Sequence, residues 1–406
     1  METTWLQCIW AGRGIDTRMS TDTDTPVADV RAIESGTELS RFARGWHCMG
    51  LASSFRDGKP HQIEAFGTAL VVFESSEGRL NVLDAYCRHM GGNLAQGTIK
   101  GDAVACPFHD WRWGSSGACT GVPYARRPPK LARTRSWPTL ERNGLLFVWN
   151  DPQRRPPPDD VTIPVFEGYG TDEWTDWSWN SLLVEGSNCR EVIDNVVDMA
   201  HFYYVHMVKP TFFKNVFENH IASQYMSATG RPDIDLDSNY GQEGLLMDSW
   251  ATYYGPSFMV NGQTLTSDGI SSEGLLINCH YPVSATSFVL QWGAIVKKLP
   301  GMSEAEGEQL ATTFADSLGE AFMQDVTIWR SKTRVDNPLL CDEDGPVYQL
   351  RRWYHQFYVD VEDIDPDMVN RFEFEVDTTE AQAKWEDEMA LSIAARANQT
   401  APANQL

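Results

Sequence analysis

The sequence predicts an α+β protein in which a small all-β unit precedes a larger domain with an antiparallel sheet curved around a long helix. The chain has 406 residues, more than one hydrophobic core usually supports. Short β-rich runs separated by turn residues fill residues 41–151, whereas residues 182–332 mix long strands with helical stretches. Between them, residues 151–160 contain three consecutive prolines, which continue neither a helix nor a strand ladder. This segment is therefore the predicted domain boundary.

The two ends of the chain are predicted to be tails. The first residues are rich in Thr, Asp and Ser and show no hydrophobic period, so they cannot bury enough apolar area to offset their ordering entropy. Met19 is an alternative start to Met1. The expected segments are a mobile tail at 1–40, an all-β domain at 41–155, a second domain at 156–385 and a helix end with a disordered tail at 386–406.

The strands of the first domain are predicted from alternating apolar residues. ALVVF (69–73) and RLNVLD (79–84) are separated by a turn, and TLERNGLLFVW (139–149) contains Asn143-Gly144 at its centre. Asn-Gly between apolar runs is the strongest short-range signal for a β-hairpin. This domain should therefore be a set of short hairpins.

The second domain combines helical and strand patterns. Helical stretches are expected within 182–206 and over 303–332, and strands at 245–254, 275–281 and 287–296. Strands in sequence followed by a long helix predict the antiparallel sheet around a helix.

Composition excludes several classes of protein. The net charge of −23 opposes binding to nucleic acid or to an anionic membrane surface. The sequence shows no run of 18 apolar residues and no pattern of a secretory signal. Its eight Cys lack the spacing of a disulfide framework. These observations together predict a cytoplasmic protein. The 15 Trp suit a protein that walls a large apolar pocket.

A first metal motif lies in the all-β domain. Cys87 and His89 form C-x-H, and Cys106 and His109 form C-x2-H, with glycine and proline at the turns. Structural zinc is one reading, but zinc boxes usually pair like ligands. The mixed pairing favours a [2Fe–2S] cluster with two Cys on one iron and two His on the other.

A second metal motif is D-x2-H-x4-H, formed by Asp198, His201 and His206, with Asp194 preceding it. On one continuous helix Asp194, Asp198 and His201 share a face. The two His diverge by roughly 140° at 3.6 residues per turn, so both reach one metal only if the helix widens or breaks. Two His and one carboxylate make the facial triad of non-haem Fe(II) oxygenases.

The carboxylate is expected from the predicted helix over residues 303–332. Phe322, Asp325 and Trp329 lie at i, i+3 and i+7, so the acid shares a face with two large aromatic residues. Metal ligation would compensate the burial of this acid. Asp316 and Glu320 are rivals with more polar neighbours.

The two motifs in this order resemble the terminal oxygenase subunit of Rieske non-haem iron oxygenases over residues 41–385. The matching positions are Cys87, His89, Cys106, His109, Asp198, His201, His206 and Asp325. The resemblance implies a helix-grip catalytic domain, one mononuclear Fe(II) and one [2Fe–2S] cluster per subunit, and a homotrimer arranged head to tail. It also implies that Asp198 bridges His201 and, across the interface, His109 of the next subunit. O2 would be a substrate, and electrons would come from an NAD(P)H-dependent flavin and iron–sulfur reductase, since the chain has no dinucleotide-binding glycine turn.

The whole-chain pattern, including CPFHDWRW and DNVVDMAHFYYVH, is similar to the 3-ketosteroid 9α-hydroxylase subfamily. This implies a steroid substrate, either free or as a coenzyme A thioester. Gln224, Asn278, Phe322 and Trp329 are the candidate substrate-binding residues. Other readings are hydroxylation, demethylation or desaturation of another polycyclic or aromatic substrate, a non-enzymatic Rieske electron carrier, and a zinc-stabilised binding protein.

Overall fold

A computed structural model describes residues 32–34, 41–234, 244–267 and 269–400. Nearly all of the predicted N-terminal tail, with Met1 and Met19, lies outside the described residues, as does the end of the predicted C-terminal tail at 401–406. Within the predicted helix end and tail at 386–406, disorder was expected for the stretch ARANQTAPANQL, which begins at residue 395; this is wrong as far as Thr400, because α6 (Thr379–Thr400) continues through it. The Ala and Arg residues there are good helix formers. In the described part of the chain no helix is long and apolar enough to cross a membrane.

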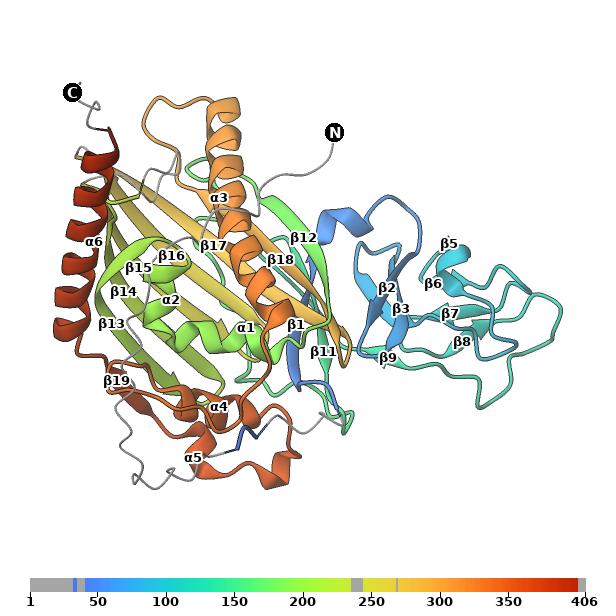
Figure 1. The fold of residues 1–406 in the computed structure, drawn as a ribbon. Coiled ribbons are helices and arrows are strands. Elements are labelled where there is room, and N and C mark those ends of the chain that lie inside the picture. The colour runs from blue at the N-terminus through green and yellow to red at the C-terminus, as the bar shows by residue number, and fades with distance from the viewer. Residues whose placement is uncertain (1–31, 35–40, 235–243, 268, 401–406) are drawn as a thin grey trace, which may run out of the picture.

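The N-terminal unit consists of three small antiparallel sheets (Figure 1). Its Asn143-Gly144 turn joins two strands with φ of 54° and 73°, the left-handed conformations that a tight hairpin requires. The predicted hairpin is thus confirmed. The three sheets consist of β1 (Gly45–Leu51), β11 (Leu145–Asn150) and β10 (Thr139–Arg142); β2 (His61–Ala65), β3 (Thr68–Glu74), β4 (Leu80–Asp84) and β9 (Ser136–Trp137); and β5 (Thr98–Lys100), β6 (Ala103–Ala105), β7 (Arg112–Gly114) and β8 (Cys119–Gly121).

The C-terminal unit is built on an eight-stranded antiparallel sheet with the order β12-β18-β17-β16-β15-β14-β13-β19. Helix α3 (Glu304–Ser331) runs across it, and Figure 1 shows α1 and α2 beside α3 over the same sheet. The predicted α+β class is confirmed. The strands are β12 (Ser178–Glu185), β13 (Val208–Glu218), β14 (Ile221–Gly230), β15 (Leu246–Tyr254), β16 (Phe258–Ser267), β17 (Ile270–Ser284), β18 (Ser287–Val296) and β19 (Phe372–Glu375), and the remaining helices are α1 (Arg190–Asp194), α2 (Met199–Tyr204), α4 (Val347–His355) and α5 (Pro366–Val369).

Small residues seat α3 closely against the sheet. The helix begins with a capping box, in which Ser303 and Glu306 bond each other's backbone N–H. A Cβ on Gly319 would lie 2.9 Å from Nε1 of Trp292, and this indole donates to the Ala315 carbonyl at 3.0 Å. The close packing fixes the rotation of α3, and with it the face that carries Phe322.

Two buried histidines lie where the N-terminal unit meets the large sheet. His47 of β1 contacts Ser257 Oγ at 3.0 Å, whereas neither ring nitrogen of His280 in β17 has a hydrogen-bond partner among the described residues. Burial lowers the pKa of His47 to about 4 and that of His280 to about 3. Both rings are therefore neutral in the folded protein near pH 7.

These two histidines should make the protein sensitive to acid. Unfolded histidine has a pKa of about 6.5, so below this pH the unfolded chain binds more protons than the folded one. The contribution of these histidines to the free energy of unfolding should be fully present above about pH 6.5. Below that pH it should decrease by about 1.4 kcal/mol per pH unit for each histidine. Urea unfolding at pH 7, 6 and 5 measures this. His280→Leu should remove the contribution of one histidine to this pH dependence, whereas the exposed control His355→Leu should leave the pH dependence unchanged. An equal pH dependence in the wild type and both variants would show that burial of His280 is not its cause.

Candidate metal centres and cavity

Two tight loops carry the first predicted ligand set. Cys87 follows β4 and Cys106 follows β6, and each loop closes on its cysteine: the Cys87 N–H donates to the Gly92 carbonyl at 2.8 Å, and the Cys106 N–H donates to the Trp111 carbonyl at 2.9 Å. Asp110 has φ of 55°, close to the 76° of Gly91 in the other loop. Asp tolerates the left-handed region better than most residues, so the two loops have similar turns despite different sequences.

The loops bring two thiols and two imidazoles together. The rings of His89 and His109 lie 4.9 Å apart, and a Cβ on Gly92 would lie 2.6 Å from Cys106 Sγ, so this glycine permits the close approach of the loops. Nδ1 of His109 is buried and has no partner among the described residues. Trp113 Nε1 donates to Cys87 Sγ at 3.3 Å, and burial raises the pKa of the Cys87 thiol. An unpaired imidazole nitrogen beside two buried thiols fits a [2Fe–2S] cluster.

Cys87→Ser should bleach the cluster absorbance and leave the second metal site occupied. A hydroxyl is a much poorer ligand for iron than a thiolate, and the two ligand sets share no residue. Visible spectroscopy with iron and sulfide analysis measures this. The exposed Cys341→Ser is the matched control. A Cys87→Ser protein with the wild-type spectrum would exclude Cys87 as a ligand.

The second ligand set lies where the predicted helix breaks. Helix α1 ends at Asp194, a 3₁₀ turn covers Asn195–Val197, and Asp198 is extended with ψ of 95° before α2 begins. The expectation of one helical face shared by Asp194, Asp198 and His201 is therefore wrong. Asp194 instead forms an ion pair with Arg351 at 2.6 Å. The break arises because Asp198 caps α2, accepting from the His201 backbone N–H at 3.1 Å.

The end of α2 brings the two histidines together. The backbone N–H groups of Val205 and His206 both donate to the His201 carbonyl, which widens the last turn, and Met207 follows with φ of 60°. The rings of His201 and His206 then lie 4.9 Å apart. This is the widening and termination that the sequence required for both rings to reach one metal.

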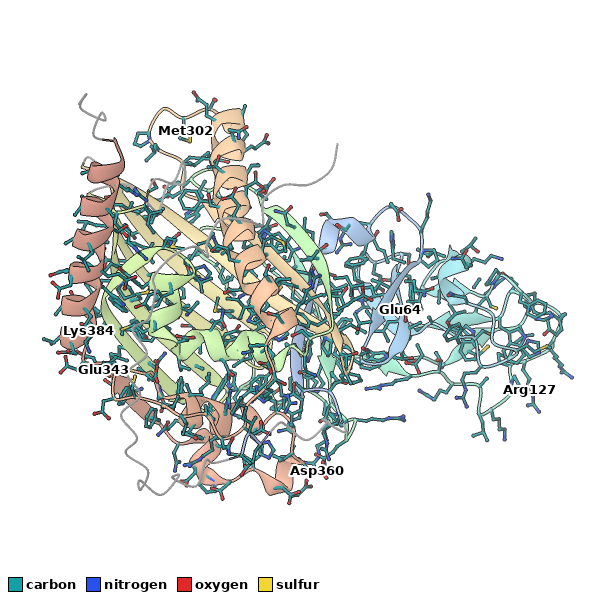
Figure 2. The ribbon with its side chains drawn as sticks, in the orientation of Figure 1. Glu64, Arg127, Met302, Glu343, Asp360 and Lys384 are labelled. Atoms are coloured by element: carbon teal, nitrogen blue, oxygen red, sulfur yellow. The ribbon has the colours of Figure 1, made fainter. Side chains whose placement is uncertain are left out.

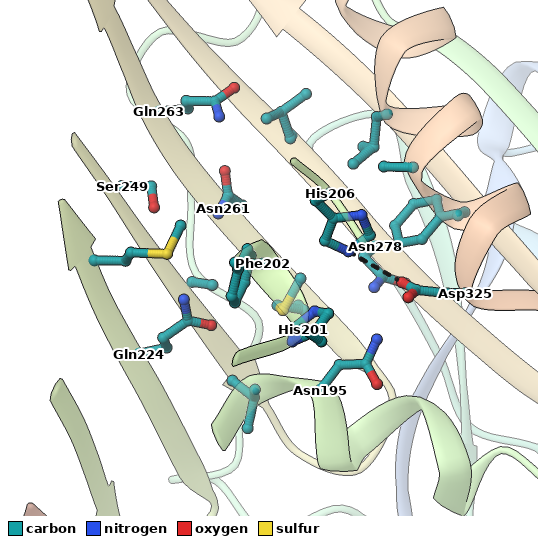
Figure 3. A pocket seen from close by; sticks show the side chains of 18 of the residues that line it. Asn195, His201, Phe202, His206, Gln224, Ser249, Asn261, Gln263, Asn278 and Asp325 are labelled. Carbon is teal, nitrogen blue, oxygen red and sulfur yellow. Dashed lines mark ion pairs between the residues drawn. The ribbon is translucent and has the colours of Figure 1, made fainter. Parts of the chain in front are cut away.

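Asp325 completes the cluster from α3. One ligand atom from each of His201, His206 and Asp325 lies within 4.8 Å of the others, and Nε2 of His206 is 3.5 Å from Oδ2 of Asp325 (Figure 3). Asp325 is only 5% exposed, whereas its rivals Asp316 and Glu320 are exposed. Two imidazoles and one carboxylate fit a mononuclear non-haem iron.

Hydrogen bonds orient both imidazoles. Nδ1 of His201 contacts the Asp198 main-chain carbonyl, and Nδ1 of His206 lies 3.2 Å from Oε1 of Gln324. The expected bond from the His201 ring to the Asp198 carboxylate does not form within the chain, since Oδ1 is 3.9 Å from Nδ1 and is used to cap α2. Nε2 is thus the nitrogen of each ring that remains for a metal. Burial lowers the pKa of His201; burial also lowers that of His206, but Asp325 outweighs it and raises the pKa.

A cavity of about 260 Å³ opens over these three ligands. All four candidate substrate-binding residues line it: Gln224 of β14, Asn278 of β17, and Phe322 and Trp329 of α3. Other wall residues were not predicted from the sequence, among them Asn195, Ser249, Asn261, Gln263, Met226 and Met247. Alternation was the available signal, because on β16 Met259, Asn261 and Gln263 all face the cavity whereas Phe258 and Val260 belong to the core behind it.

The arrangement belongs to the class of Rieske oxygenases, in which an all-β cluster domain precedes an iron-containing helix-and-sheet domain. Dicamba monooxygenase bound to dicamba matches with a TM-score of 0.64 at 16% identity, over 79% of this chain and 98% of that chain. NdmA from Pseudomonas putida CBB5 with caffeine matches with a TM-score of 0.61 at 16% identity, over 81% and 96%. These solved structures share the fold.

Sequence comparison gives the family. Residues 45–138 match the Rieske [2Fe-2S] domain and residues 148–358 the 3-ketosteroid 9alpha-hydroxylase C-terminal domain. A 3-ketosteroid-9-alpha-monooxygenase oxygenase component from Rhodococcus rhodochrous is 60% identical, with 94% of this chain and 98% of the relative aligned. Its counterpart from Mycobacterium tuberculosis (strain ATCC 25618 / H37Rv) is 59% identical over 92% and 97%. The chain therefore belongs to the family of 3-ketosteroid-9-alpha-monooxygenase oxygenase components, whose class uses a [2Fe–2S] cluster and a mononuclear iron.

Proposed function

We propose that this protein is the oxygenase component of a monooxygenase that hydroxylates a 3-ketosteroid at the 9α position in steroid catabolism. The observation that carries the proposal is the cavity over His201, His206 and Asp325, on a chain that also has the predicted Rieske ligand loops. Relatives at 59–60% identity are 3-ketosteroid-9-alpha-monooxygenase oxygenase components. A non-enzymatic electron carrier needs only the cluster site, so the presence of the proposed iron site favours an oxygenase.

Each site has a defined set of proposed ligands. Cys87, His89, Cys106 and His109 would hold the [2Fe–2S] cluster, and His201, His206 and Asp325 would hold the iron. A facial triad leaves open positions on iron for O2, and this is the chemistry that the metal supplies. The predicted boundary at residue 155 falls in the segment between β11 and β12, and we keep it as the boundary between the two domains.

The cavity has both apolar and polar wall residues, which suits a mostly apolar ligand with a few polar groups. Phe322 and Trp329 are 6% and 3% exposed and line the cavity together with the proposed iron ligand Asp325. Asn278 is buried, and its Oδ1 has no hydrogen-bond partner among the described residues. A buried amide without a partner is costly, so a polar group of the ligand would stabilise it. In this proposal the aromatic residues exclude water and Gln224 and Asn278 orient the steroid.

We infer that the protein acts as a head-to-tail trimer in the cytoplasm and receives electrons from an NAD(P)H-dependent flavin and iron–sulfur reductase. Figure 1 shows β6 and β7, which flank one ligand loop, on the far side of the N-terminal unit from α2 and α3. This separation favours electron transfer between neighbouring subunits. Met90 and Phe108 of the ligand loops are 63% and 58% exposed, as expected of residues that a neighbour covers. Sedimentation analysis checks the trimer.

The reaction can be tested with the iron-loaded protein, a reductase, NADH and ¹⁸O2. A 3-keto steroid should gain one labelled oxygen at C9, whereas 3β-hydroxy sterols and aromatic acids should give no product. Demethylation would release formaldehyde, and desaturation would give a product two hydrogens lighter. The second outcome has a specific precedent, because cholesterol 7-desaturase nvd 1 from Ciona intestinalis is 29% identical over 79% of this chain and 69% of its own. Oxidation of the cluster with no product from any substrate would indicate an electron carrier.

A further inference from the structure

The distal end of the N-terminal unit is basic, in contrast to the rest of the chain. Residues 86–135 contain eight Lys or Arg and two Asp, a net charge of +6 in a chain of net charge −23. The basic loop, defined here as residues 122–133, carries exposed Arg126, Arg127, Lys130 and Arg133. None of these four side chains forms an ion pair with a carboxylate in the described part of the chain. Figure 2 shows Arg127 at the end of the unit farthest from the large sheet.

The basic loop is connected to a cluster ligand through two aromatic side chains. Tyr124, 63% exposed, accepts a hydrogen bond from Trp111 Nε1 at 2.6 Å. The Trp111 ring is stacked on His89, with centroids 4.4 Å apart and an interplanar angle of 8°. A hydrogen bond and a ring stack therefore connect the surface at Tyr124 to the proposed cluster ligand His89.

The other ligand imidazole leads to a different surface. His109 contacts the exposed ring of Phe108 at 3.9 Å between centroids. In the proposed trimer this imidazole faces Asp198 of the neighbouring subunit. The trimer thus accounts for the exposed tips of the two ligand loops and assigns no partner to the basic loop.

We propose that the basic loop is the docking surface for the reductase, which contacts it with an acidic face that carries a one-electron iron–sulfur donor. This inference rests on the proposed function, which requires such a donor. One electron leaves the reduced iron–sulfur group of the reductase and enters the [2Fe–2S] cluster; the donor is oxidised, the cluster is reduced, and no bond or proton changes. Plant-type [2Fe–2S] centres have lower potentials than Rieske centres, so the transfer is downhill. Opposite charges accelerate such encounters and make them dependent on salt.

The test uses an acidic plant-type [2Fe–2S] ferredoxin, reduced beforehand, as the probe. Stopped-flow absorbance gives the second-order rate of reduction of the holoprotein cluster, and titration gives the dissociation constant, each at 50 and 200 mM salt. Arg126→Glu/Arg127→Glu should lower the rate about 10-fold or more at low salt and remove most of its salt dependence. Lys59→Glu/Arg79→Glu, with the same charge change elsewhere on the unit, should change the rate less than about 2-fold.

Two further measurements separate docking from other causes. The small cation methyl viologen radical should reduce the cluster of every variant, which shows that the cluster is intact. Tyr124→Ser should keep the dissociation constant and lower the reduction rate within the complex. Equal losses in both double variants would overturn the proposal, as would a changed subunit number in Arg126→Glu/Arg127→Glu, since the loop would then bind a second copy of the chain. If the wild type forms no steroid product but the docking differences hold, the substrate is wrong and the docking surface stands.

Discussion

Asp325→Ala is expected to lose the mononuclear iron and all measurable product formation while keeping the [2Fe–2S] absorbance. The substitution removes the carboxylate of the proposed triad and leaves the imidazoles of His201 and His206 without an anionic partner in a buried site. The proposed cluster ligands lie in the N-terminal unit and are unchanged by the substitution. Iron analysis, the visible spectrum and product yield measure the three outcomes.

Two matched variants on the same helix make this result specific. Asp316 and Glu320 are exposed on α3, so Asp316→Ala and Glu320→Ala should bind iron as the wild type does. A full iron content in Asp325→Ala, or an equal loss in Asp316→Ala, would show that the third ligand has been misassigned. His201→Ala and His206→Ala should match Asp325→Ala in losing iron while retaining the cluster spectrum.

Local motifs made the grouping of the proposed ligands predictable from the sequence. Cys87 and His89 belong to one turn, as do Cys106 and His109, so spacing alone predicted how each pair is presented. Asp325 was predictable because helical periodicity put it on the same buried face as Phe322 and Trp329.

Features that depend on tertiary packing were not predictable to the same degree. The pattern around Asp198 predicts one helix, but the Asp198 side chain caps α2 and a new helix starts there. An N-cap side chain contributes only about 0.5–2 kcal/mol to stability, so the sequence alone does not show whether the helix continues or restarts. The polar wall residues Asn261 and Gln263 lie on β16, whose alternation shows a two-faced strand without showing which face lines a cavity. That depends on the position of α3 over the sheet.

The role proposed for Asp198 combines the site with the trimer. Its carboxylate is 49% exposed and already caps α2, while the His201 ring takes the Asp198 carbonyl as its partner. The free lone pairs of this carboxylate therefore face solvent in one chain. A ring of subunits would give them the Nε2–H of His109 of the partner subunit, because the buried Nδ1 of this imidazole is the nitrogen proposed to bind the cluster. The bridge would then run from the partner subunit's His109 through the Asp198 carboxylate and backbone to His201.

Asp198→Asn should slow electron delivery by about 10- to 100-fold, the usual effect of losing an outer-shell partner of a metal ligand. Asn is as good an N-cap as Asp, so α2 and the iron content should be preserved. Its neutral amide is a weaker acceptor for the imidazole N–H of the neighbouring subunit. Stopped-flow oxidation of the pre-reduced protein, mixed with O2 and a 3-keto steroid, measures the step, with Asp316→Asn as the matched control. A wild-type rate and product yield in Asp198→Asn, with the trimer intact by sedimentation, would refute the bridge and the need for a neighbouring subunit in catalysis.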